Sequence, residues 1–65
     1  MSAIRTVLHL VRAEVPPAVV AERDWVVYLS TMELAAHGEP PLPPGRLDHD
    51  QLVLLVFAAD LVVTW

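Results

Sequence analysis

The last eighteen residues, Asp48–Trp65 (DHDQLVLLVFAADLVVTW), constrain this chain most, because they are almost continuously apolar after Gln51. Only Asp60 and Thr64 interrupt that run. The whole chain has 65 residues, and at this size folding buries roughly 60% of the surface that the unfolded chain exposes. We therefore expect part of this apolar surface to contact another protein chain.

The composition excludes several classes of function. The sequence is 55% hydrophobic and 18% charged, with a net charge of -4, which excludes a disordered chain. The basic residues are four arginines spread singly along the chain (Arg5, Arg12, Arg23 and Arg46), so there is no basic patch for nucleic acid. There is no cysteine, which excludes disulfides, thiolate metal sites and thiol nucleophiles.

The apolar segments do not predict export or membrane insertion. Near the amino terminus, His9 and Arg12 interrupt the hydrophobic stretch, and no small-residue cleavage site follows it, so we expect no signal peptide. The later run from Leu52 is broken by Asp60 and is shorter than the roughly 18 residues of a membrane span. These features favour a cytoplasmic protein without a membrane span.

Hydrophobic patterning predicts one small α/β domain over residues 1–65. Residues 4–11 and 25–29 are rich in β-branched or bulky side chains, as is 61–65, and we expect these three segments to be strands. Two helices are expected at residues 31–37 and 52–59. A connection with one helical turn from Pro17 to Glu22 follows the first strand, and a proline-rich loop, residues 39–45, separates the helices. The predicted architecture is a three-stranded, mostly parallel sheet with helices on one face and a bare opposite face, in the order β-connection-β-α-loop-α-β.

Two sequence patterns indicate helix starts. Ser30 and Glu33 are spaced as a capping box, in which each side chain satisfies a backbone N–H of the other residue. Asp48 and Gln51 have the same spacing before the last apolar run. We expect all four residues to act as helix caps.

The predicted last helix has more apolar surface than one contact face can cover. On a helical wheel, Leu52, Leu55, Val56 and Ala59 form the face expected to sit on the sheet. Val53 and Phe57 lie at one flank and Leu54 lies nearly opposite. One exposed leucine would be ordinary, but the wide apolar arc favours a partner. Two tryptophans are added to the predicted contact residues because aromatic side chains are enriched at interfaces. The predicted contact residues are therefore Trp25, Val53, Leu54, Phe57 and Trp65.

No set of residues predicts catalysis, a cofactor or a metal. The three histidines (His9, His37 and His49) lie in different predicted elements, and no HExxH spacing is present. Ser30 and Thr31 follow a strand at a predicted helix start, a position that can bind an anion. However, no glycine allows close backbone approach there, and Glu33 would oppose an anion. A small ligand at Ser30–Glu33 is therefore the weaker alternative.

Three segments together resemble a known family. These are Val7–Leu10 (VLHL), Val27–Gly38 (VYLSTMELAAHG) and the closing segment Asp48–Trp65. They resemble the DsrE-like sulfur-relay group, in particular its DsrH/TusB branch. The resemblance implies a DsrE-like α/β fold that assembles into hetero-oligomers and passes persulfide sulfur between cysteines. This chain has no cysteine and no room for the additional helix and strand after residue 12, so the resemblance implies a reduced, non-catalytic member.

The sequence thus predicts a non-catalytic interaction subunit of a larger complex, with a hetero-oligomer or a homo-oligomer as its assembled form. An alternative is a structural accessory subunit of an unrelated enzyme with several subunits. A reactive cysteine on the partner close to this chain would distinguish the sulfur-relay subunit from the accessory subunit.

Overall fold

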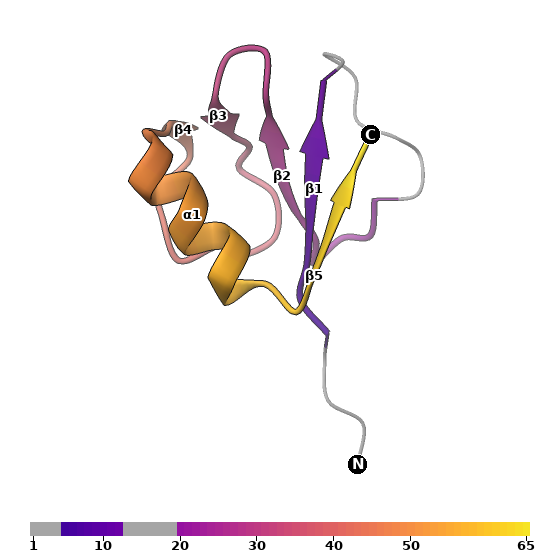
Figure 1. Cartoon of the computed structure of the whole chain (residues 1–65). Coiled ribbons are helices and arrows are strands. Elements are labelled where there is room, and N and C mark those ends of the chain that lie inside the picture. Colours follow the sequence, from indigo (N-terminus) through magenta and orange to yellow (C-terminus); the bar gives the residue numbers. More distant parts are fainter. Residues whose placement is uncertain (1–4, 13–19) are drawn as a thin grey trace.

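The computed structural model describes residues 5–12 and 20–65, which form a mixed five-stranded sheet and one helix. The strands are β1 (Val7–Val11), β2 (Trp25–Tyr28), β3 (Glu33–Leu34), β4 (Gly45–Arg46) and β5 (Leu61–Thr64), and the helix is α1 (His49–Ala58). The spatial order is β4-β3-β2-β1-β5 (Figure 1). β1 pairs in parallel with both β2 and β5, whereas the β2–β3 and β3–β4 pairs are antiparallel.

The predicted fold class is therefore wrong in two respects. The sheet has five strands of mixed direction, not three mostly parallel strands, and the described residues contain one helix, not two. The three-stranded DsrE-like outline fails with it. Ile4, the expected first residue of β1, and the first half of the expected helical turn, residues 17–19, lie outside the described residues.

A β-hairpin replaces the helix expected at residues 31–37. β2 and β3 pair through Tyr28↔Glu33 and Val27↔Leu34, and the loop between them ends at Met32, which has a φ of 53°. Four-residue hairpin loops of this kind are built around a turn followed by a left-handed residue. A helix of about two turns has little stability by itself. In the hairpin, by contrast, Leu34 is buried, with 2% of its surface exposed. Ser30 and Glu33 are thus not helix caps, because tertiary burial outweighs a local capping pattern.

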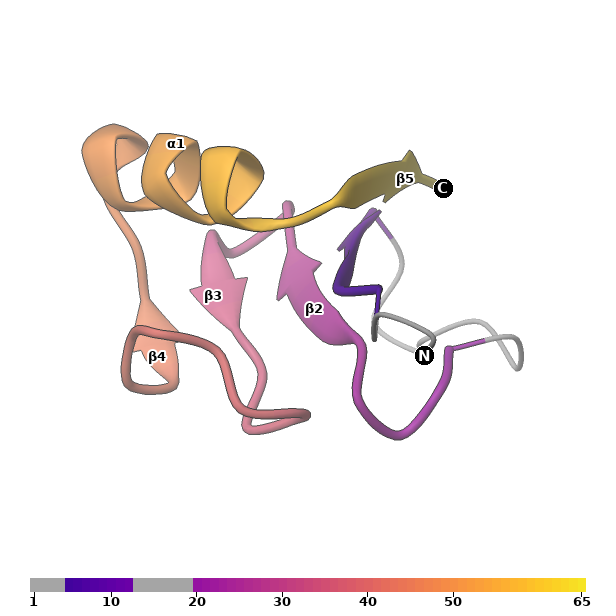
Figure 2. The ribbon, with the colours of Figure 1, turned by 90° about the horizontal axis from the view of Figure 1, so that it is seen from below.

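The main core lies between the sheet and α1. It is formed by Leu8, Trp25, Val27, Leu34, Leu47 and Leu55. Figures 1 and 2 show α1 in front of the sheet on the side of β4, β3 and β2, with β1 and β5 beside it. The partly buried Leu10 and Val62 pack against this core, so they belong to the same face of the sheet.

The opposite face of the sheet is not bare, which corrects the sequence-based expectation. Val11 and Val26 are buried on it, with 1% and 2% exposed. Asp24, just before β2, contacts His9 on this face, and His37, after β3, contacts the Asp24 carbonyl oxygen. A side chain at Gly38 would meet the Arg23 carbonyl oxygen at 2.7 Å, and Gly38 has a φ of 70°. Glycine at this position therefore allows the two segments to touch.

No helix among residues 5–12 and 20–65 is long and apolar enough to cross a membrane, since α1 has ten residues.

Candidate interaction surface

The start of α1 is fixed by the capping box expected from the sequence. The Gln51 N–H donates to Oδ1 of Asp48 at 2.8 Å, and the Asp48 N–H donates to Oε1 of Gln51 at 2.9 Å. Two backbone donors that the helix leaves unpaired are thereby satisfied. The helix begins at His49, three residues before the predicted start. This cap fixes the residue at which α1 begins.

The inner side of α1 is narrow. Leu55 is completely buried against the sheet, and Leu52 and Ala59 pack partly against the core. Val56, which the wheel assigns to the same face, is exposed at 37%, so that part of the prediction is wrong. Leu55 is the one fully buried residue of this ten-residue helix, so most of the apolar side chains of α1 lie at the surface.

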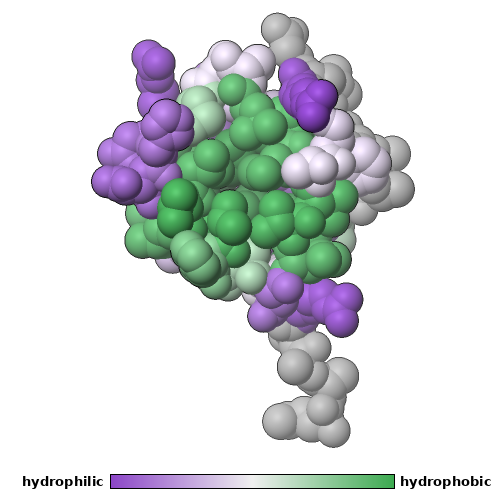
Figure 3. All heavy atoms as spheres, in the orientation of Figure 1, coloured by the Kyte–Doolittle hydropathy of each residue, from purple (hydrophilic) through white to green (hydrophobic). Residues whose placement is uncertain are grey.

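We call the outer apolar side of this helix the α1 surface; it consists of Val53, Leu54, Val56 and Phe57. Phe57 is 84% exposed and Leu54 47% exposed. Figure 3 shows that hydrophobic residues cover the centre of this face, with hydrophilic residues at its margins. Exposed large apolar side chains that gather in one place indicate a binding surface, in contrast to those scattered singly.

The structure brings only three of the five predicted contact residues together. Val53, Leu54 and Phe57 lie on the α1 surface. Trp25 is 8% exposed and belongs to the core, so its predicted role in an interface is wrong; it fills the space between β2 and α1. Trp65 follows β5 and stacks on His9, on the face of the sheet away from α1. It therefore belongs to a different surface.

A polar cluster that the sequence analysis missed lies on that opposite face. It consists of His9 on β1, Asp24 before β2 and Trp65 after β5. The indole Nε1–H of Trp65 donates to Nδ1 of His9 at 2.9 Å, and Nε2 of His9 lies 2.7 Å from Oδ2 of Asp24. An indole N–H is a donor only. The network therefore assigns His9 as the neutral tautomer with its proton on Nε2, which donates to Asp24.

The environment of Asp24 keeps its carboxylate charged. Burial alone raises the pKa of Asp24, but the hydrogen bonds from His9 and from the Ala21 N–H outweigh burial and lower the pKa below its ordinary 3.8. His37 also contacts this segment, because its Nδ1 lies 2.6 Å from the Asp24 carbonyl oxygen. The carboxylate is thus held by two hydrogen bonds, from His9 and from the Ala21 N–H, and His37 contacts the backbone of the same residue.

The hydrogen bonds of this cluster occupy both ring nitrogens of His9 and join three segments of the chain. His9 is also 4% exposed. The signal in the sequence was a histidine in an otherwise apolar strand, since such a buried polar group needs partners. The sequence did not predict the register of β1 with β2 and β5, which places Asp24 and Trp65 next to His9.

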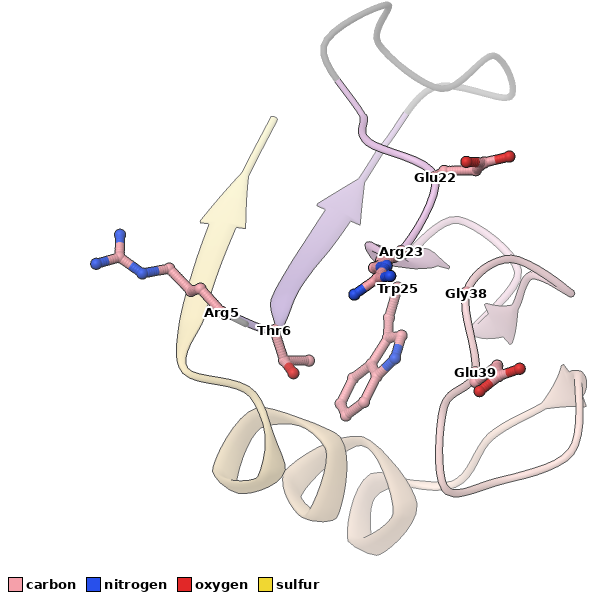
Figure 4. A pocket seen from close by; sticks show the side chains of 7 residues that line it. All are labelled: Arg5, Thr6, Glu22, Arg23, Trp25, Gly38 and Glu39. Carbon is pink, nitrogen blue, oxygen red and sulfur yellow. The ribbon is translucent and has the colours of Figure 1, made fainter. Parts of the chain in front are cut away.

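Two hollows in the surface are open and of mixed character. The first, of about 600 Å³, lies where β1 and β2 begin and is lined by Arg5, Thr6, Glu22, Arg23, Trp25, Gly38 and Glu39. Figure 4 shows the Trp25 indole in the middle of this hollow, whereas Arg5 points away from it past β5. The lining carries two arginines and two glutamates, which selects neither anions nor cations.

The second hollow, of about 470 Å³, lies at the expected ligand position, Ser30–Glu33, with Met32 and Arg46. There is a hairpin turn there and not a helix start, so the physical basis for an anion site is lost. Among the described residues, no group of three His, Asp or Glu side chains is arranged to hold a metal ion.

Comparisons with protein families, with curated proteins and with solved structures give no match for this chain. The resemblance to the DsrH/TusB branch stays a prediction from the sequence.

Proposed function

We propose that this chain is a non-catalytic interaction subunit that docks onto another protein through the α1 surface. The observation that carries the proposal is Phe57, a large aromatic residue with 84% of its surface exposed beside three other exposed apolar side chains. Burying apolar area is the main favourable contribution to protein association. Aromatic residues at the centre of an interface often contribute most of the binding energy.

Charges around the α1 surface indicate what kind of partner fits it. Asp48 and Asp50 lie at the start of α1, and Asp60 lies just after its end; all three are exposed. The α1 surface itself carries no charge. The complementary partner therefore has an apolar groove that receives the helix and basic residues at the rim of that groove.

The resemblance to the DsrH/TusB branch makes this proposal more specific. The chain has no cysteine, so in a sulfur relay the persulfide would reside on the partner. In that case the partner carries a reactive cysteine near the bound helix. A partner without such a cysteine would support the structural accessory subunit instead.

The test combines isolation of the partner with measured binding. The wild-type chain and variants are used to isolate bound proteins from the native source, and binding of the purified partner is then measured by calorimetry. Phe57→Asp and Leu54→Lys should each raise the Kd at least about 30-fold, the effect of losing roughly 2 kcal/mol at the centre of an interface. Raising the salt concentration should slow association of the wild-type chain.

A matched control separates loss of contact from added charge. Leu61→Lys adds the same charge at a residue of similar exposure, 44% against 47% for Leu54, but on β5. It should leave binding of the partner unchanged. If Phe57→Asp and Leu54→Lys bind the partner as tightly as the wild-type chain, the α1 surface is not the docking site.

A further inference from the structure

The outer edge of β5 carries backbone groups that no other described strand uses. In the sheet order β4-β3-β2-β1-β5, β5 is an edge strand paired only with β1. The Leu61 N–H donates to the Thr6 carbonyl and the Trp65 N–H to the Leu10 carbonyl. Directions alternate along a strand, so the N–H and C=O groups of Val62 and Thr64 point away from β1, to the side where residues 5–12 and 20–65 place no strand.

This edge lacks the usual features that prevent strands from pairing. Natural edge strands carry lysine, proline or bulges that block a second strand. Residues 61–65 (LVVTW) include no charged residue and no proline. The strand is also one of β-branched residues, which favour sheet pairing.

We propose that β5 pairs with β5 of a second copy of this chain, antiparallel about a two-fold axis at Val63. This register places Val62 opposite Thr64 of the second copy, so that the two residues with outward backbone groups hydrogen-bond to each other on both sides of the axis. It makes one continuous sheet with both α1 helices on the same face. The α1 surface stays exposed, so this inference is independent of the proposed function.

The same register pairs the exposed apolar side chains on the other face. Leu61, Val63 and Trp65 share that face, because Val62 faces the core between them. Pairing about Val63 sets Leu61 directly opposite Trp65 of the second copy. Both side chains are 44% exposed in the single chain, and aliphatic–aromatic cross-strand pairs stabilise sheets. A second copy therefore fits both the backbone groups and the side chains of this edge.

The charges at the ends of the strand are complementary in this arrangement. Extending the β1–β5 register, in which Leu10 lies beside Thr64, places the exposed Arg12 level with Asp60 of the second copy. The two Cα atoms are then about 10 Å apart, two strand spacings, which an arginine side chain can bridge. The two Asp60 residues lie at opposite ends of the pair, about 20 Å apart. Opposite charges are thus near each other and like charges are separated.

A single cysteine tests the pairing and its register together. The chain has no cysteine of its own, and a two-fold axis at Val63 brings the two Val63 side chains together as a close, non-hydrogen-bonded pair. Val63→Cys should form a disulfide-linked dimer on mild oxidation. Leu54→Cys on the α1 surface and Leu61→Cys, which faces Trp65, should remain mostly monomeric under the same conditions.

Sedimentation of cysteine-free chains tests the association without a cross-link. The wild-type chain should change from monomer to dimer as its concentration is raised from about 1 µM to about 1 mM, the range of weak, small interfaces. Thr64→Pro removes an outward N–H but no bond to β1, and Leu61→Lys adds charge to the edge. Each should raise the dimer dissociation constant at least tenfold, while Leu54→Lys should not.

Three results would overturn the inference. One is a wild-type chain that stays monomeric up to 1 mM, and another is Val63→Cys oxidising no faster than Leu54→Cys. The third is a dimer that Leu54→Lys abolishes and Thr64→Pro leaves intact, since that dimer would form through the α1 surface. Circular dichroism of each variant verifies that the folded chain is being compared.

Discussion

Replacing His9 by leucine should remove a large part of the stability of this domain. His9 lies on β1, an interior strand between β2 and β5, and donates to the Asp24 carboxylate at 2.7 Å. The substitution leaves Asp24, which is 8% exposed, with the Ala21 N–H as its remaining hydrogen-bond donor. Losing a hydrogen bond to a buried charged group costs about 1.5–3 kcal/mol. The Trp65 indole also loses its acceptor, but water can replace it because this residue is partly exposed.

We therefore expect His9→Leu to lower the free energy of unfolding by about 2–3 kcal/mol. A domain of this size has a total stability on the order of 5 kcal/mol, so the variant should keep only about half of that stability. At 4–8 °C per kcal/mol, the melting temperature should fall by about 8–24 °C. Urea unfolding followed by circular dichroism, at a concentration low enough to keep the chain monomeric, measures the change.

A double-mutant cycle tests whether the loss arises from the contact with Asp24. His9→Leu, Asp24→Ala and the double variant are compared with the wild-type chain, and the coupling energy between the two sites should be about 1–2 kcal/mol. Trp65→Phe keeps the ring but removes the N–H, and should cost less than about 1 kcal/mol. A coupling energy under about 0.3 kcal/mol would refute the reasoning, because the two side chains would then act independently.

Two further predictions follow from the same face of the sheet. The pKa of Asp24 is lower in the folded chain than its ordinary 3.8, so the unfolded chain binds more protons than the folded chain as the pH falls. The free energy of unfolding should therefore stay constant above about pH 4 and decrease below it. Asp24→Asn should flatten this decrease, which urea unfolding at a series of pH values measures. Gly38→Ala should destabilise the domain by about 2 kcal/mol or more, because the new Cβ meets the Arg23 carbonyl oxygen at 2.7 Å and φ is 70°. An unchanged melting temperature for Gly38→Ala would contradict this steric argument.

The sequence located several elements because their signals are local. Runs of β-branched residues correspond to β1, β2 and β5, and the spacing of Asp48 and Gln51 identified the cap of α1. These patterns depend on residues within one turn or one strand. The exposed side of α1 was also predictable, since an apolar arc of that width cannot be covered by one sheet.

The failures arise where distant residues decide the structure. The Ser30 and Glu33 spacing is a valid capping pattern, but pairing with β2 and burial of Leu34 stabilise a hairpin there instead. Trp25 was predicted at an interface because of its size, whereas its position at the start of β2 directs it under α1. His9 could not be matched to Asp24 and Trp65 without the parallel register of β1 with both neighbouring strands. Each error follows from using local patterns for a contact between distant segments.

The exposure of Phe57 and its neighbours is the central claim, and dye binding by the isolated chain tests it most directly. A fluorescent dye that binds apolar surfaces is titrated into the folded wild-type chain and into Phe57→Asp, with sedimentation of both samples at the same concentrations. We predict strong dye fluorescence for the folded wild-type chain and a large reduction for Phe57→Asp, with equal melting temperatures. A folded wild-type chain that binds no dye, or binds it equally with and without Phe57, would contradict the claim that the α1 surface is free for a partner.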